Sequence, residues 1–115
     1  MFAFDTSIIK NQESLQRAAQ EATAIQEEDL PQAKVQSIHD FIQFKETENM
    51  LTTMELFLKS SLLRQESRAD HMREDFPEAD GSWLKWIVLN KNLTEGYRFE
   101  EPPWGKFRFQ PHDLK

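Results

Sequence analysis

Cysteine is absent from this chain of 115 residues, and glycine occurs only three times. Without cysteine there is no disulfide framework, no thiolate nucleophile and no zinc ribbon. Gly81, Gly96 and Gly105 cannot form a glycine-rich loop that binds phosphate. The longest apolar runs are a few residues, so no transmembrane segment is predicted. The N-terminal residues 1–5 lack the basic start and apolar core of a signal peptide.

The chain also lacks an excess of positive charge. It carries 14 basic and 20 acidic side chains, a net charge of −6. A general nucleic-acid binder needs a basic surface, so this balance argues against nucleic acid as a partner. The length fits one domain, and the content of 38% hydrophobic and 30% charged residues is typical of a folded chain.

Proline and glycine are distributed unevenly along the sequence. Residues 1–76 contain no glycine and one proline, Pro31, whereas the other prolines and all three tryptophans follow residue 76. Residues 1–55 carry 4 basic and 10 acidic side chains, and residues 56–115 carry 10 of each. The sequence therefore predicts an acidic helical bundle over 1–76 and a turn-rich, aromatic part over 77–115, which packs on the bundle as one domain.

Helical spacing recurs three times before Pro77. A first helix is expected from about Asp5 to Asp29, with N-caps offered by Asp5, Thr6 and Ser7 and an apolar stripe made of Ile8, Leu15, Ala18, Ala22 and Ile25. Pro31 suits the first turn of a second helix through residue 42. A third helical run covers residues 50–62, and a junction near residues 44–48 leaves open whether these two runs are one bent helix or two.

The late segment predicts a small β-hairpin. Asp80-Gly81 is a turn pair, residues 83–90 are rich enough in aromatic and β-branched side chains for a strand, and residues 97–99 supply its partner. Trp83 and Trp86 would stand on opposite faces of that strand, so the hairpin buries one and the other needs the helices or a partner. From Glu101 onward the proline-broken tail is expected to lie over another surface.

The densest charged stretch runs from Arg64 to Pro77. If it is helical, one face carries Arg64, Arg68, His71 and Asp75. Ser67, His71 and Asp75 also fall four residues apart, as a Ser/His/Asp triad on a helix would require. A triad needs an oxyanion hole and a nucleophile on a tight turn, and a helix end beside three arginines supplies neither.

Three other hypotheses apply to this stretch. His71 and Asp75 could bind a metal, although two ligands without a third are a weak signal. Three arginines and a histidine could hold a dicarboxylate or phosphate. We favour ordinary ion pairing, with Glu66–Arg73 and Arg64–Asp75 pairs tying a helix terminus to the following turn. Such density is typical of a surface buried against a partner, where charge complementarity fixes the register.

Residues 64–86, RQESRADHMREDFPEADGSWLKW, closely resemble the C-terminal signature of succinate dehydrogenase and fumarate reductase flavoproteins, shared by L-aspartate oxidase and adenylylsulfate reductase-like flavoproteins. The matching positions are Arg64, Glu66, Ser67, Arg68, His71, Arg73, Asp75, Pro77, Asp80, Trp83 and Lys85. Ala69 replaces the usual glycine and Asp70 a usual alanine, which indicates a divergent branch. The resemblance extends over roughly residues 8–90.

The resemblance implies a mainly α fold, a spectrin-repeat-like three-helix bundle with a short C-terminal β-hairpin and an extended tail. It also implies that FAD and the catalytic residues belong to domains upstream, so this chain would bind no cofactor and be non-catalytic alone. Its expected partners are an FAD-binding subunit or domain, together with an iron–sulfur subunit, in the cytoplasm or peripheral to a membrane through the complex. The candidate interface residues are Arg64, Glu66, Arg68, His71, Arg73, Asp75, Trp83 and Trp86. The alternative is a stand-alone helical interaction module that self-associates into a homo-oligomer.

Overall fold

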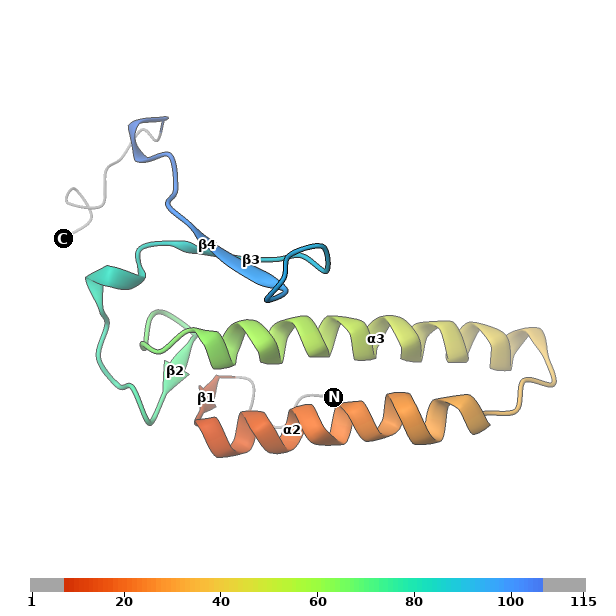
Figure 1. Cartoon of the computed structure of the whole chain (residues 1–115). Coiled ribbons are helices and arrows are strands. Elements are labelled where there is room, and N and C mark those ends of the chain that lie inside the picture. The colour runs from red at the N-terminus through yellow and green to blue at the C-terminus, as the bar shows by residue number, and fades with distance from the viewer. Residues whose placement is uncertain (1–7, 107–115) are drawn as a thin grey trace. The chain divides into compact units, whose positions relative to one another are not determined.

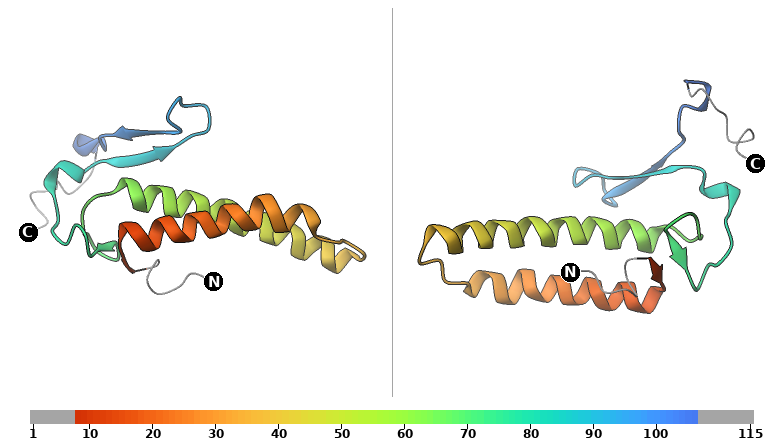
Figure 2. Two further views of the ribbon diagram at one scale, coloured as in Figure 1. Left: turned by 60° about the horizontal axis from the view of Figure 1, so that its bottom comes forward. Right: turned by 180° about the vertical axis from the view of Figure 1, so that it is seen from behind.

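The computed structural model describes residues 8–106, which belong to two compact units, residues 1–79 and 80–115. The described part of the first unit contains two α-helices, α2 (Gln12–Ala24) and α3 (Ile38–Leu63). It also contains two short strands, β1 (Ile9–Lys10) and β2 (Met72–Arg73), which pair in parallel. The helices lie side by side and antiparallel, and β1 and β2 lie at the end where α2 begins and α3 ends (Figures 1 and 2). The mainly helical fold class is confirmed.

Helix α2 begins later than its apolar spacing predicts. Asn11 and Ser14 form a capping box: the Asn11 side chain accepts from the Ser14 backbone N–H at 2.9 Å, and the Ser14 hydroxyl accepts from the Asn11 N–H at 3.2 Å. Ile9 and Lys10 are held in β1 instead, so the predicted helix is wrong over these residues. The predicted caps at residues 5–7 lie outside the described residues. Beyond Ala24 the chain continues through a π-helical turn, Ile25–Asp29.

The connection to α3 is not helical where the sequence predicted a second helix. Pro31 lies in a short 3₁₀ turn, Leu30–Gln32, and α3 starts only after Ser37, which forms a second capping box with Asp40. From Ile38 to Leu63 the helix is continuous, because no proline or glycine interrupts it. The two late helical runs are therefore one helix. The three-helix bundle is not confirmed, since the described residues form two α-helices.

The core between the two helices is small. Its buried apolar side chains are Leu15, Ala22, Leu51 and Leu58. Helix α3 also carries apolar side chains away from α2, and Ile38, Ile42 and Leu56 remain 75%, 48% and 47% exposed. The helix pair thus leaves a second apolar face of α3 uncovered by α2. Within residues 8–106, no helix combines the length and the apolar character needed to cross a membrane.

The second unit contains the predicted hairpin, formed by β3 (Trp86–Leu89) and β4 (Tyr97–Glu100). The strands are antiparallel, with Trp86 opposite Glu100 and Leu89 opposite Tyr97. Trp83 lies in a 3₁₀ turn, Gly81–Trp83, and not in the strand as predicted, because the Asp80 side chain caps that turn. The two tryptophans therefore do not lie on opposite faces of one strand.

An aromatic cluster forms beside β4. The rings of Trp83 and Phe99 meet edge to face with centroids 5.5 Å apart. The Lys85 ammonium lies 4.5 Å from the Trp83 ring centroid and 4.7 Å from that of Phe99. Trp83 is half-buried, whereas Trp86 is 48% exposed. The hairpin therefore packs Trp83 internally and leaves Trp86 to the surface.

Candidate functional site

The charged segment after α3 is a folded loop and not a helix. Helix α3 ends at Leu63, Arg64 is extended, and short bridges join Arg68 to His71 and Arg73 to Phe76. Contacts with β1 and with the end of α3 override the helical spacing of the sequence. The prediction that Arg64, Arg68, His71 and Asp75 share one helical face is therefore wrong. The loop nevertheless brings the six predicted charged residues together in two ion-paired groups.

Arg73 is the centre of the first group. Only 2% of this residue is exposed. Its Nη1 donates to the carbonyl oxygens of Ser61 at 2.7 Å and Arg64 at 3.2 Å, in and just after the last turn of α3. Its Nε and Nη2 donate to both carboxylate oxygens of Asp75, at 2.7 and 2.6 Å. A guanidinium in this position satisfies carbonyls that the helix leaves unpaired and is favoured by the helix dipole.

Asp75 carries the link onward to α2. Its Oδ2 accepts a hydrogen bond from the backbone N–H of Gln12, the first residue of α2, at 3.1 Å. Beside it, Glu74 accepts from the Asn11 side chain at 2.9 Å. Carboxylates are favoured at a helix N-terminus. The Arg73–Asp75 pair therefore joins the C-terminal end of α3 to the N-terminal end of α2.

Glu66 is the centre of the second group, which we call the Glu66 cluster and which comprises Arg64, Glu66 and Arg68. The Glu66 side chain is fully buried. Arg64 Nη1 donates to its Oε1 at 2.6 Å, and Arg68 Nη2 donates to its Oε2 at 2.9 Å. Ion pairing of the arginines with acidic neighbours is thus confirmed. The partners differ from those predicted, since Arg64 pairs with Glu66 and Arg73 with Asp75.

Ser67 and His71 are engaged in ways that do not suit a catalytic triad. The Ser67 hydroxyl accepts from the backbone N–H of Arg73 at 2.7 Å and lies 2.9 Å from the carbonyl of Phe76. His71 Nε2 lies 3.3 Å from the carbonyl of Arg64, and Asp75 is occupied by Arg73. Within the described residues, no group of three or more His, Asp or Glu side chains is placed to hold a metal ion. The polar side chains of this loop brace its backbone.

The N-terminal contacts of the loop were missed by the sequence analysis. Lys10 in β1 is 2% exposed, and its ammonium lies 5.1 Å from the Phe57 ring centroid. Burial, aided by the charge of Arg73, lowers the pKa of Lys10. Asn11 and Gln12 reach the loop from 63 residues away in sequence. Asn11 carried a local signal, because an asparagine before a helical run is a strong N-cap.

We expect the stability of the first unit to fall as the pH is lowered below about 6.5. Burial lowers the pKa of His71 below its ordinary 6.5, so the unfolded state binds a proton before the folded state does. Stability is then lost between pH 6.5 and the lowered folded pKa. The hydrogen bonds from Arg73 lower the pKa of Asp75, so a second loss follows at acidic pH as this carboxylate is protonated.

Urea unfolding measured between pH 7.5 and 5 tests the histidine contribution. His71→Gln keeps a side-chain donor and should flatten the pH dependence in this window. His39→Gln, at an exposed position of α3, is the control for loss of a histidine. A slope that survives unchanged in His71→Gln contradicts the assignment.

Ala69 occupies a backbone conformation that favours glycine. Its φ is +50°, in the left-handed region, where an alanine side chain is strained by about 1–2 kcal/mol. Ala69→Gly should therefore stabilise the first unit by up to about 1 kcal/mol, after the extra flexibility of the unfolded glycine is subtracted. Ala33→Gly is the control, because Ala33 has a φ of −63° and should lose stability. Equal effects of the two substitutions on urea unfolding would contradict the strain.

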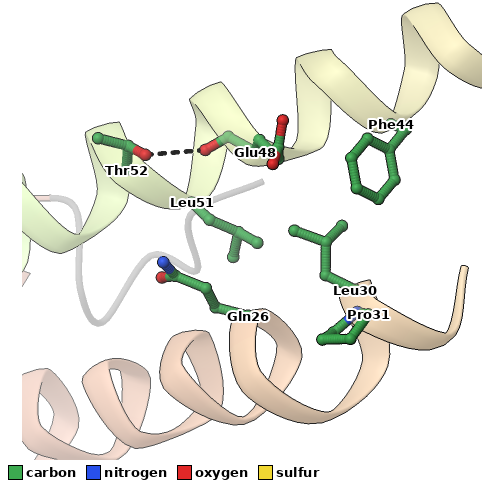
Figure 3. Close-up of a pocket in the computed structure, with 7 residues that line it drawn as sticks. All are labelled: Gln26, Leu30, Pro31, Phe44, Glu48, Leu51 and Thr52. Carbon is green, nitrogen blue, oxygen red and sulfur yellow. Dashed lines mark hydrogen bonds between the residues drawn. The ribbon is translucent and has the colours of Figure 1, made fainter.

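The cavities described in the first unit lie along the helix pair. One of about 310 Å³ lies between the π-helical turn and the middle of α3 (Figure 3), where its lining residues are Gln26, Leu30, Pro31, Phe44, Glu48, Leu51 and Thr52. In it Leu30 and Leu51 point toward the gap between the helices, and Thr52 donates to the backbone carbonyl of Glu48 at 3.0 Å. A second of about 260 Å³ lies against Ala22 and Leu58, and a third of about 460 Å³ against Ile25 and Met50. The sequence analysis predicted none of them.

Comparison with known families identifies the fold that carries this loop. Residues 2–112 match the model of the fumarate reductase flavoprotein C-terminal family. This chain belongs to that family. The resemblance drawn from residues 64–86 is thereby confirmed. In this flavoprotein C-terminal domain, the signature forms the loop that links the ends of α2 and α3.

Relatives of the flavoprotein C-terminal domain are longer proteins. The chain is 39% identical over 83 residues to an uncharacterised FAD-dependent oxidoreductase of Methanocaldococcus jannaschii, a match that covers 72% of the chain and 15% of the relative. It is 34% identical over 92 residues to a subunit of the fumarate reductase (CoM/CoB) of Methanothermobacter marburgensis, covering 77% and 17%. L-Aspartate oxidase of Bacillus subtilis is 34% identical over 68 residues, covering 59% and 13%. No solved structure matches.

Proposed function

We propose that this chain serves as the non-catalytic helical domain of an FAD-dependent oxidoreductase, bracing the FAD-binding subunit or domain of that enzyme and docking a redox partner subunit. The observation that carries the proposal is the family match over residues 2–112, joined to relatives whose names include an FAD-dependent oxidoreductase and a fumarate reductase subunit. The chain corresponds to 15–17% of the length of these two relatives. FAD would be held outside the matched part.

The charged loop supports a bracing role. Its backbone is fixed by β1, by both helix ends and by buried ion pairs, while Arg64 and Arg68 keep 22% and 41% of their side chains exposed. A rigid surface with partly exposed arginines suits contact with a second protein surface. We assign the interface with the FAD-binding part to the six predicted charged residues.

Two further surfaces belong to the same proposal. The outer face of α3, with Ile38, Ile42 and Leu56, suits a third helix, which would complete the spectrin-repeat-like bundle. Trp83 and Trp86 in the second unit are assigned to contact with a partner, of which an iron–sulfur subunit is the candidate. A cytoplasmic location follows from the same proposal. Self-association as an independent module is less favoured, because the relatives are flavoproteins.

A chimera tests the proposal. In the matching fumarate reductase subunit of Methanothermobacter marburgensis, the matched part is either deleted or replaced by this chain, which gives the fumarate reductase chimera. We expect the deletion to purify with little flavin, and the chimera to recover a flavin-to-protein ratio close to that of the intact reductase. A chimera with no more flavin than the deletion would refute bracing. Stoichiometric binding of added FAD by the isolated chain would refute the non-catalytic assignment.

A further inference from the structure

We infer that Arg64 and Arg68 form a receptor for an acidic side chain of the FAD-binding partner. The inference rests on the proposed function and names the chemistry of the group that docks. It divides the six predicted interface residues into two kinds. Arg73, Asp75 and His71 hold the loop together, whereas Arg64 and Arg68 face the partner.

The charge balance of the Glu66 cluster is the first argument. Two guanidinium groups share one carboxylate, so the cluster carries a surplus of one positive charge. Arg73 does not add to this surplus, because Asp75 neutralises it through two hydrogen bonds. Lys10 is a further cation of the same loop region, since its strand pairs with β2. A second carboxylate placed against Arg64 and Arg68 would neutralise the surplus.

The burial of the cluster is the second argument. The Glu66 side chain is 0% exposed, Arg64 is 22% exposed and Arg68 is 41% exposed. The carboxylate therefore lies inside and the guanidinium groups lie between it and the surface. Arg68 presents its Nε and Nη2 to Glu66. Guanidinium groups oriented in this way suit a carboxylate that approaches from outside.

The rigidity of the backbone on both sides of Glu66 is the third argument. Arg68 and His71 exchange two backbone hydrogen bonds, of 2.8 and 2.9 Å, across a turn that holds Ala69 at a φ of +50°. The carbonyl of Arg64 is contacted by Arg73 Nη1 and His71 Nε2. Both arginines are thus positioned before any partner binds, which reduces the entropy lost on docking.

The position of the cluster favours a protein carboxylate over a small free anion. The three cavities described in the first unit are lined by residues of the helix pair and of the turns that follow α2, and not by Arg64 or Arg68. A small ligand is normally enclosed in a pocket, whereas these guanidinium groups lie at the surface of a loop. The relatives extend well beyond the matched part, so a protein surface is available to the loop. We therefore commit to an aspartate or glutamate side chain.

The test compares Arg68→Gln with Lys34→Gln in the fumarate reductase chimera. Both variants remove one positive charge, and Lys34 is exposed in the connection between α2 and α3, at the other end of the helix pair. Glu66 keeps Arg64 as a partner in Arg68→Gln, so the isolated chain should retain its circular dichroism spectrum and melting behaviour. We expect FAD to leave the Arg68→Gln chimera about tenfold faster, as for a lost interfacial charge pair. The Lys34→Gln chimera should match its parent.

The outcomes separate the two proposals. If the parent chimera holds no flavin, the proposed function fails and this inference fails with it. If the parent chimera holds flavin and Arg68→Gln releases it no faster than Lys34→Gln does, only the inference is overturned. Loss of structure in the isolated Arg68→Gln chain would also overturn it, because Arg68 would then be structural. Saturable binding of sodium acetate by the isolated chain at submillimolar concentration, followed by arginine Nε NMR signals, would overturn it in favour of a small-anion site.

Discussion

Replacing Arg73 with glutamine is expected to lower the free energy of unfolding of the first unit by about 3 kcal/mol. Arg73 is buried and supplies hydrogen bonds to the end of α3 and to Asp75 at once. Glutamine is shorter and uncharged, so carbonyl oxygens of the last turn lose their donor and Asp75 loses its cation. A buried pair broken from one side leaves groups that water can no longer satisfy.

Urea unfolding followed by circular dichroism at 222 nm measures this loss, because the signal reports α2 and α3. Lys45→Gln is the matched control in α3. Its pair with Glu48 is exposed, with the two side chains 54% and 39% accessible, so its loss should cost less than about 1 kcal/mol. If the two variants unfold at the same urea concentration, Arg73 does not hold the helix ends together.

The elements that the sequence predicted well are those set by local signals. The continuous helical spacing from Ile38 to Leu63 contains no proline or glycine, and α3 follows from it. The hairpin of β3 and β4 likewise follows from aromatic and β-branched runs around a turn that ends at Gly96, whose φ is 72°. Its first strand starts at Trp86 and not Trp83, because Asp80 caps a 3₁₀ turn before it.

The elements that were predicted wrongly depend on contacts between distant residues. Ile9 and Lys10 continue an apolar helical pattern, yet they pair with Met72 and Arg73 in the parallel sheet. That pairing satisfies backbone groups of two segments at once and holds the start of α2 at Asn11. Local spacing carries no information on such a partner, so the predicted helix began too early.

The candidate site was predicted in composition but not in geometry. The charge density and the family resemblance both selected residues 64–77, and six of the predicted residues do meet in this loop. The exchange of partners was not predictable, because a helix with its i,i+4 neighbours was assumed. In the loop, Glu66 is enclosed and attracts the nearest arginines, two residues away on either side. The interface role of these residues, and of Trp83 and Trp86, stays a prediction.

Replacing Leu58 with alanine is the second substitution with a large expected effect. Leu58 is 1% exposed and is one of four buried apolar side chains in the described core. Truncation of a buried leucine typically costs about 3–5 kcal/mol, from the lost transfer of the side chain and from the cavity left behind. Leu58 already lines a cavity of about 260 Å³ together with Ala22 and Leu62. Removing its three terminal carbons enlarges this cavity, so we expect a loss of about 3 kcal/mol.

Leu56→Ala is the control that separates packing from helix propensity. Leu56 lies in the same helix, two residues away, but is 47% exposed. The chemical change is identical, and alanine favours the helix equally at both positions, so the difference between the variants measures burial against α2. We expect Leu56→Ala to cost less than about 1 kcal/mol in the isolated chain. In the fumarate reductase chimera the cost at Leu56 should rise if a third helix covers this face, because an exposed side chain then becomes a buried one. An unchanged cost at Leu56 in the chimera would mean that the outer face of α3 stays uncovered there.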